Sequence, residues 1–398
     1  MPLFGQHTML LNRDRADALM DREDIAVVVA STPINTYYLS SWATDASWGF
    51  GDLAMAILPR NHALDAAVLT VEVDMGQPQQ GQGTWMAVRG YARKPGIGAG
   101  GVQGVLTAEG LPQNHQEAVA QYLRELGLDR SRVAFEDRGL GLDVSALLGG
   151  TIDVVPARDL LRDIRMVKTP AEMANMRAAA RKTELSLQLS AEALAAGATC
   201  AEAERVFWSA SALAGGRPVF LLITPYRPGF GRLTKNAKLQ QGDMVTFDAT
   251  AEFAHYTSDI GRTAVIGEPS PEQLKRYNAT RLGWHASLSH FRAGALSTDV
   301  EKAVVASIQA HGNPDFRACG LHSVGLEHTD HPHPGGGMHT FELVDRMVLS
   351  CDLPWIGTEI GKFHFEDIIY LDGDTVEILN DADGRLMACI DGRTVRVD

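Results

Sequence analysis

Short apolar runs alternate with helix-like stretches along the first 155 residues of the chain. The segments DIAVVVAS (24–31) and LAMAILP (53–59) are apolar and are bounded by turn residues, as buried strands are. HQEAVAQYLRELGL (115–128) has the spacing of an amphipathic helix and ends near a glycine. We therefore expect a small α/β domain in this part of the chain.

The second part of the chain opens with a strong helix-start signal. Thr169 is a suitable N-cap, Pro170 suits the first helical position, and Glu172 completes a capping box. Gly197 is a reasonable stop for this helix. Further helical stretches cover 200–214 and 271–311, and strand-like segments cover 242–267, 346–357 and 362–380. The pattern predicts an α/β (α+β) protein with two domains, 1–160 and 161–398.

Bulk composition narrows the function classes. The net charge of -13 argues against a nucleic-acid partner, because binding a polyanion needs a basic face. The four cysteines are scattered, so no disulfide framework is indicated, and we expect a cytoplasmic setting. No signal-peptide core and no long apolar run is present, so we expect no membrane insertion. A glycine-rich stretch at 96–104 lacks the dinucleotide fingerprint and is typical of a flexible loop or lid.

Acidic residues stand inside apolar, strand-like segments. Asp248 and Asp259 are eleven residues apart across an expected β-hairpin, and Asp352 and Glu366 occupy a second expected hairpin. A carboxylate buried in an apolar strand is costly unless it is paired or bound to a metal ion. Each acid alone is typical of a turn or a salt bridge, but the four together indicate a shared cation.

A histidine-rich segment lies between these two hairpins. HSVGLEHTDHPHP, from His322 to Pro334, contains four histidines. The segment by itself fits either a metal-binding cluster or a polar loop. The carboxylates on both sides of it favour the first interpretation.

Five motifs in order resemble the pita-bread metalloenzymes, which include aminopeptidase P, prolidase, methionine aminopeptidase and the metal-free creatinase. PINTYYLSSW (33–42) is similar to a stretch of the creatinase-type N-terminal domain, and IRMVKTPAEMANMRAAA is similar to its junction with the catalytic domain. GDMVTFDATAEFAHYTSDIGRT, the H-x-x-G of His322, and the F-E-D of Glu366 complete the series. The resemblance implies a creatinase-like N-terminal α/β domain and a C-terminal pita-bread domain.

The resemblance also implies a metal site and a homodimer. Its metal ligands would be Asp248, Asp259, His322, Asp352 and Glu366. Asp259 and Glu366 would bridge two ions. Carboxylate oxygens with one imidazole suit manganese, iron, cobalt or zinc, with one or two ions bound.

Several positions depart from the peptidases of this family. Asp352 stands where the family usually has glutamate, and Gly231 and Thr329 stand where the peptidases carry histidines. His364 replaces an arginine. Because such histidines hold a peptide carbonyl in the transition state, we expect poor amide hydrolysis.

The function favoured by these departures is a metal-dependent lyase or hydrolase of a small non-peptide substrate. His328 stands six residues after His322, where the DMSP-lyase branch of this fold has its base, and a histidine suits that role. His364 is expected to line the site, and His331 is a further candidate acid or base. His333 and His339 are more typical of a solvent-facing loop.

Aromatic residues and two other functions complete the expectations. Trp42, Trp48 and Tyr256 are candidates for substrate contact, with packing as the alternative. The alternative functions are an Xaa-Pro dipeptidase or aminopeptidase with altered contacts, and a metal-free binding module.

Overall fold

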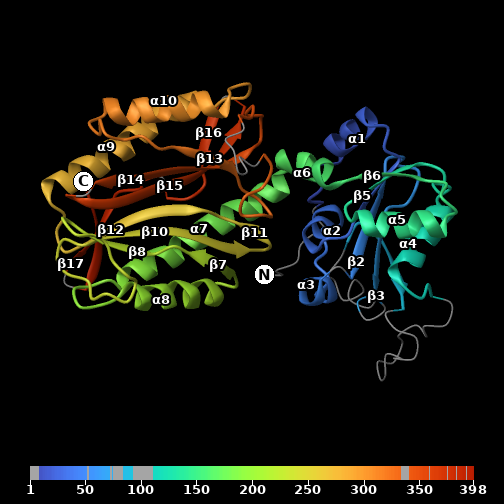
Figure 1. Cartoon of the computed structure of the whole chain (residues 1–398), viewed down its shortest axis with the longest axis horizontal. Coiled ribbons are helices and arrows are strands. Elements are labelled where there is room, and N and C mark those ends of the chain that lie inside the picture. Colours follow the sequence, from blue (N-terminus) through green and yellow to red (C-terminus); the bar gives the residue numbers. More distant parts are fainter. Residues whose placement is uncertain are drawn as a thin grey trace, which may run out of the picture. The chain divides into compact units, whose positions relative to one another are not determined.

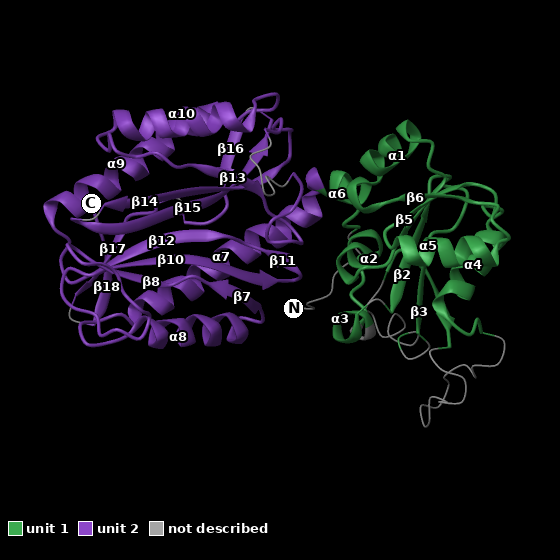
Figure 2. Cartoon of the chain, in the orientation of Figure 1, with its two compact units in different colours: residues 1–165 green, residues 166–398 purple. Residues whose placement is uncertain are grey.

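The computed structural model divides into two compact units, residues 1–165 and 166–398 (Figure 2). The residues that it describes are 9–51, 53–71, 74, 84–92, 111–332, 340–357, 359–373, 375–381, 383–390 and 392–398. The glycine-rich stretch at 96–104, expected to be a loop or lid, lies outside the described residues.

The first unit is built on a six-stranded mixed sheet in the order β4-β3-β2-β1-β5-β6. β1 pairs antiparallel with β2 and parallel with β5. The strands are β1 (Val27–Ala30), β2 (Ala54–Pro59), β3 (Ala67–Val71), β4 (Ala87–Tyr91), β5 (Arg132–Phe135) and β6 (Asp153–Pro156). The helices are α1 (Arg13–Arg22), α2 (Pro33–Ser40), α3 (Asp45–Phe50), α4 (His115–Glu125), α5 (Arg138–Leu147) and α6 (Arg158–Met166).

Burial of the central strands explains why they were recognisable in the sequence. Every residue of β1, β2 and β3 is buried, so these strands read as continuous apolar runs. Helix α4 packs on α5 and contacts β3 and β4. The strands expected at 24–31 and 53–59 and the helix expected at 115–128 are confirmed.

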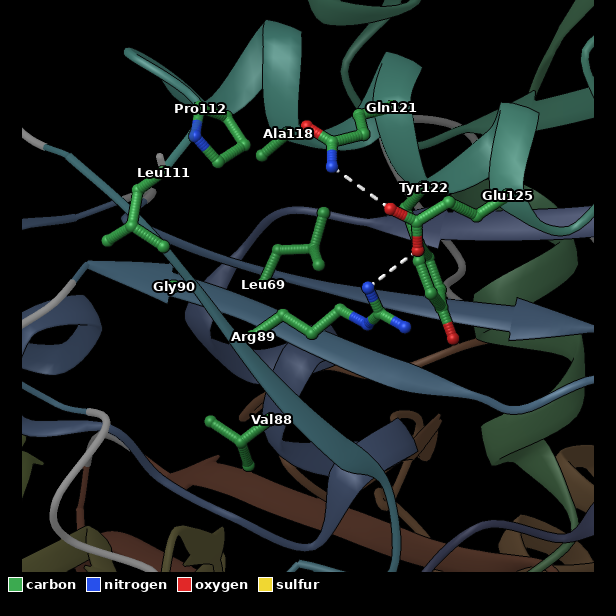
Figure 3. Close-up of a pocket in the computed structure, with 10 residues that line it drawn as sticks. All are labelled: Leu69, Val88, Arg89, Gly90, Leu111, Pro112, Ala118, Gln121, Tyr122 and Glu125. Carbon is green, nitrogen blue, oxygen red and sulfur yellow. Dashed lines mark hydrogen bonds and ion pairs between the residues drawn. The ribbon is translucent and has the colours of Figure 1, made fainter. Parts of the chain in front are cut away.

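A pocket of about 260 Å³ opens in this unit beside β4 and α4 (Figure 3). The Arg89 guanidinium lies 4.5 Å from the centre of the Tyr122 ring, and its Nη1 is 2.6 Å from Glu125 Oε2. Gln121 Nε2 donates to the other oxygen of the Glu125 carboxylate at 3.0 Å. The charged groups of this pocket are therefore already paired, and we assign it no chemistry.

The second unit contains a curled, mainly antiparallel sheet, as the pita-bread resemblance implies (Figure 1). Its main path runs β13-β14-β15-β12-β10-β8-β9. The strands are β7 (Arg217–Leu221), β8 (Thr224–Arg227), β9 (Gly231–Arg232), β10 (Met244–Phe253), β11 (Tyr256–Thr257), β12 (Ile260–Ile266), β13 (Gly320–Ser323), β14 (Val348–Gly357), β15 (Gly361–Asp372), β16 (Thr375–Ile378), β17 (Leu386–Ile390) and β18 (Arg393–Val397).

Two helix pairs accompany this sheet (Figure 1). α7 (Pro170–Glu192) packs on α8 (Cys200–Leu213), and this pair contacts β10 and β7. α9 (Pro271–Ser287) packs on α10 (Ser297–Ala310), and this pair contacts β15 and β13. No helix in the described part of the chain is long and apolar enough to cross a membrane.

The helix boundaries both confirm and correct the sequence analysis. Thr169 caps α7, and both hydrogen bonds of the predicted capping box with Glu172 are present. α7 ends at Glu192, before the expected stop at Gly197. The helical region expected at 271–311 is confirmed, but it consists of two helices, joined by the 3-10 turn Leu288–His290 and the residues after it. Its helical periodicity did not reveal this chain reversal.

The crossing of α9 and α10 depends on a glycine. A Cβ atom on Gly283 would lie 2.4 Å from the Cα of Ile308 and 2.8 Å from its backbone nitrogen. Real Cβ atoms do not approach backbone this closely, so the helices would have to move apart. Gly283 thus gives up helix propensity in exchange for close packing.

We predict that Gly283→Ala lowers the free energy of unfolding of the second unit by about 3 kcal/mol, as overpacked cores do. Gly49→Ala is the control, because a Cβ there meets nothing within 4 Å. That exposed helical position should tolerate or gain up to about 1 kcal/mol. Urea unfolding followed by tryptophan fluorescence measures both variants, and an equal, small effect would contradict the packing argument.

Glu172 is a buried carboxyl at the start of α7. Burial raises its pKa to about 7, although Lys168 and the Thr169 N–H lower it. Its Oε2 accepts from Thr169 N at 2.8 Å, and its Oε1 accepts from the Tyr256 hydroxyl at 3.3 Å. Since the folded-state pKa lies above the usual 4.5, ionisation of Glu172 costs stability as pH rises toward 7.

We predict that Glu172→Gln removes part of this pH dependence. Below about pH 4.5 the two proteins should differ least, because the carboxyl is protonated in both the folded and the unfolded state. As pH rises to about 7, the variant should gain up to about 3 kcal/mol relative to the native protein. Unfolding free energies across this range test it; a difference that does not change with pH would contradict it.

Candidate metal centre

A row of four residues crosses the curled sheet on one face. Asp248 of β10 pairs with Gly261 of β12, Gly261 pairs with Glu366 of β15, and Glu366 pairs with Asp352 of β14. Directly opposite residues point to the same face of a sheet. Three carboxylates that are far apart in the sequence therefore share one face.

Gly261 makes room for this arrangement. A Cβ atom at this position would lie 2.6 Å from Glu366 Cβ and 3.0 Å from the His364 ring. The missing side chain lets those two residues occupy the space between β10 and β15. Only glycine fits this position without displacing them.

Asp259 and His322 reach the same place from other elements. Asp259 immediately precedes β12, and its Oδ1 accepts from Thr250 Oγ1 at 2.9 Å. His322 lies on β13, with Nδ1 3.2 Å from the carbonyl oxygen of Ser323. Its Nε2 is 3.3 Å from Asp259 Oδ2. The five residues expected from the sequence thus converge.

Three overlapping groups have ligand atoms that lie within 4.8 Å of one another. One is Asp248, Asp259 and Glu366, and another is His322, Asp352 and Glu366. The third is Asp259 and His322 with His328. His328 is the member that the sequence analysis did not expect among the ligands; its only signal there was its position six residues after His322.

The crowded carboxylates perturb one another. Burial, and then the charges of Asp259, Asp352 and Asp248, raise the pKa of Glu366 well above its usual value. Burial and the neighbouring Asp259 raise the pKa of Asp248 to about 6. Burial and mutual repulsion therefore both oppose full ionisation of the carboxylates on this face.

The histidine side of the cluster shifts in the opposite direction. Burial opposes ionisation of Asp259, but hydrogen bonds from His322 and His328 lower its pKa below the usual range. Burial opposes protonation of His322, but Asp259 raises its pKa. Asp259 therefore remains a carboxylate and draws positive charge to itself.

The residues fit a divalent metal ion on two observations. Glu366 Oε2 is buried without a hydrogen-bond partner, although Ser350 Oγ donates to the other oxygen. In the neutral form that donates its Nδ1–H to the Ser323 carbonyl, His322 would present the lone pair of Nε2 to the Asp259 carboxylate, whereas in the protonated form its Nε2–H donates to that carboxylate. Two acceptors that face each other require a proton or a cation between them.

Two further histidines border the cluster. His328 Nε2 is 2.7 Å from Asp259 Oδ2, and its Nδ1 is 3.1 Å from Thr329 Oγ1. His364 Nε2 is 2.5 Å from Asp352 Oδ1 and 3.5 Å from Glu366 Oε2. Both side chains, proposed from the sequence as catalytic groups, lie in direct contact with predicted metal ligands.

Other candidates from the sequence lie elsewhere. His331 is not a member of the three groups found among the described residues, and its backbone N–H donates to Asp330 Oδ1 at 2.8 Å. His333 and His339 lie outside the described residues. For His331 an acid–base role stays a prediction.

Two aromatic candidates need correction. Tyr256 is fully buried and its hydroxyl bonds to Glu172, so it packs inside the unit rather than contacting substrate. Trp42 is only 3% exposed, so its ring belongs to the core of the first unit. Trp48 is partly exposed and stands edge-on to Tyr37, with ring centres 6.5 Å apart, so substrate contact stays a prediction there.

Known families match nearly the whole chain. Residues 13–167 match the creatinase/prolidase N-terminal domain. Residues 174–372, half of the chain, match metallopeptidase family M24. The chain belongs to metallopeptidase family M24. The fold expected from the motifs, an α/β N-terminal domain followed by a pita-bread domain, is thereby confirmed.

Curated relatives of this M24 protein include two archaeal dipeptidases. The Xaa-Pro dipeptidases of Pyrococcus furiosus and Pyrococcus horikoshii are 23% and 24% identical over 218 residues. Each alignment covers 54% of this chain and 62% of the relative. The chain thus matches less than two thirds of the length of these relatives.

Solved structures share the fold over more of the chain. An Xaa-Pro dipeptidase from Bacillus anthracis superposes with a TM-score of 0.72 at 18% identity, covering 94% of this chain and 98% of the other. An X-Pro aminopeptidase from Thermotoga maritima gives 0.69 at 18% identity, covering 95% and 99%. At this identity the likeness establishes the fold of the M24 protein.

We predict opposite effects of Glu366→Gln on the metal-free and metal-loaded protein. Without metal at alkaline pH, the variant should be more stable by about 1–4 kcal/mol, because it removes a crowded buried charge and keeps the bond from Ser350. With manganese it should lose the stabilisation that a bound ion supplies, about 2.7 kcal/mol at a hundredfold excess over Kd.

Thermal unfolding and calorimetric titration with manganese after chelation measure both effects. Asp299→Asn, at an exposed acid on α10 that pairs only with Lys302 among the described residues, is the control and should behave as the native protein. A variant that is less stable without metal, or one that binds manganese as tightly as the native protein, would contradict the assignment of Glu366.

Proposed function

We propose that the protein is a divalent-metal-dependent hydrolase that cleaves the amide bond of Xaa-Pro dipeptides. The observation that carries this proposal is the convergence of the ligand set Asp248, Asp259, His322, Asp352 and Glu366 on one face of the sheet. Membership of family M24 and relatives named Xaa-Pro dipeptidase support the peptide substrate.

Each part of the cluster has a distinct task in this proposal. The five residues would hold one or two ions of manganese, iron, cobalt or zinc. Bound ions of this kind polarise a scissile carbonyl and lower the pKa of water. Thr250 and Ser350 hold the carboxylates of Asp259 and Glu366 in orientation through their hydroxyls.

His328 is placed to hold and move a proton at Nε2. Its Nε2 bonds to Asp259, and Thr329 Oγ1 contacts its Nδ1, so both ring nitrogens are held. Phe220 meets its ring edge-on, with ring centres 4.8 Å apart, and fixes the plane of the imidazole. A proton donor held this way can deliver a proton to a leaving amine.

A second candidate is a lyase or hydrolase that acts on a small non-peptide compound. The specific observation in its favour is again His328, which here would remove a proton from the substrate, while Thr329 occupies the position at which the sequence analysis expects a peptidase histidine. This candidate uses the same metal ligands and predicts no release of proline from dipeptides.

Hydrolysis of Ala-Pro and Gly-Pro by manganese-loaded protein decides between the two candidates. We expect release of proline that stops on chelation, resumes with manganese, and is abolished in Asp259→Asn. His328→Gln should lower kcat by about a hundredfold or more with little change in manganese affinity.

Absence of proline release from protein that binds manganese normally would reject the dipeptidase proposal and favour the second candidate. Loss of manganese binding in His328→Gln would instead make His328 a ligand rather than a proton carrier. The expected homodimer stays a prediction, which light scattering of the purified protein would check.

A further inference from the structure

The face that bears the metal ligands continues to a lysine. Lys362 precedes His364 by two residues and Glu366 by four on β15, so strand alternation places all three side chains on one face. Directly opposite on β14 is Ile356, an exposed apolar residue. The row of acids is thus followed, farther along the same strands, by a cationic and an apolar side chain.

A second cation reaches this place from the other end of the sheet. Lys362 Nζ lies 5.7 Å from the centre of the Tyr226 ring on β8. Tyr226 pairs with Arg232 of β9, so these two side chains point to the same face. The curl of the sheet brings β8 into contact with β15, which are not neighbours in strand order. Lys362 and Arg232 therefore lie close enough to repel each other.

Neither cation has an acid of its own. In the described part of the chain, no ion pair or side-chain hydrogen bond involves Lys362 or Arg232, and Lys362 is partly buried. Burial lowers the pKa of Lys362, while Asp248 and Asp352 work in the opposite direction. Those two carboxylates are predicted metal ligands, so a bound metal ion would neutralise their charge. A partly buried ammonium without a committed counter-ion gains from an incoming anion.

A cavity beside β8 borders both Leu222 and Arg232. Leu222, opposite Asp248 in reciprocal backbone hydrogen bonds, is 59% exposed. Leu222, Thr224 and Arg232 all line a cavity of about 580 Å³. The lining of this cavity includes Arg232 but none of the four carboxylates and not Lys362, so the link between the acids and the cations rests on the face of β15 that Lys362 shares with Glu366.

We propose that Lys362 and Arg232 form an anion-binding subsite that takes a carboxylate of the substrate. The inference deepens the proposed function and rests on it, because it names a charged group of the substrate that lies at a distance from the reacting bond. The group is the C-terminal carboxylate of a dipeptide or the acid group of a small non-peptide compound. Lys362 and Arg232 act as specificity-determining residues.

Binding of N-acetylglycine and of N-acetylglycinamide to the zinc-loaded protein tests the subsite without turnover. The two probes differ only at one end, where N-acetylglycine has a carboxylate and N-acetylglycinamide has a neutral amide. The native protein should prefer the acid, and Lys362→Met or Arg232→Met should reduce the ratio of the two affinities about tenfold, the loss of one charge-assisted bond. Lys362→Arg should keep most of the preference.

Lys182→Met is the matched control. Lys182 also lies over an aromatic ring, with Nζ 5.0 Å from the centre of Phe253, and the substitution changes the net charge equally. The affinity ratio should stay unchanged in this variant. A native protein without preference for the acid, or an unchanged ratio in Lys362→Met, would overturn the proposal.

Hydrolysis of Ala-Pro and of its C-terminal amide separates the two sources of carboxylate. If the dipeptide supplies it, Lys362→Met lowers kcat/KM for Ala-Pro about tenfold and leaves the amide within about twofold. If the native protein prefers the acid probe but does not hydrolyse Ala-Pro, the anion-binding subsite stands and only the proposed function is rejected. If the native protein hydrolyses Ala-Pro but binds the acid and amide probes equally, only the anion-binding subsite is rejected.

Discussion

Four carboxylates crowd one face of the curled sheet, and the protein supplies too few positive groups there to balance them. Asp259 has two histidines beside it, but Glu366 has an oxygen with no hydrogen-bond partner and three other acids in range. Natural folds rarely keep such an arrangement for stability, because uncompensated buried charge costs several kcal/mol. The crowding makes chemical sense around a multivalent cation, and the neighbouring elements are arranged to maintain it.

The other face of the same strands holds the acids in place. Arg262 Nη1 donates to the backbone carbonyl of Glu366 at 2.8 Å, and its Nη2 donates to Asp367 Oδ1 at 2.8 Å. Trp284 Nε1 donates to the second oxygen of Asp367 at 2.8 Å. Because Asp367 follows Glu366 directly, the two acids point to opposite faces: one is fully paired inside the core and the other is left for a ligand. Strand alternation thus separates a structural acid from a functional one.

Sequence reasoning singled out the four acids that converge in the structure because acids within apolar strands contradict the usual pattern of burial. It found α7 because a capping box is a local signal whose partners are three residues apart. It missed the division of 271–311 into two helices, because that division depends on which segments pack together. The contact between His328 and Asp259 was equally hidden, since it joins residues 69 positions apart through the sheet. The register of the strands and the curl of the sheet depend on tertiary packing. From a single sequence they can be predicted only through a family resemblance.

Gly261 shows how far the sheet is adapted to the cluster rather than to its own stability. A glycine inside a strand forfeits packing and conformational restriction, yet β12 is central and otherwise buried throughout. Any larger residue would meet Glu366 and His364. Glu366 and His364 fill the space that a side chain at position 261 would take, so the glycine lets both lie on the face that carries Asp248. A binding module without metal would have no need to crowd a second carboxylate against Asp248, and for this reason the glycine argues for a centre that holds a cation.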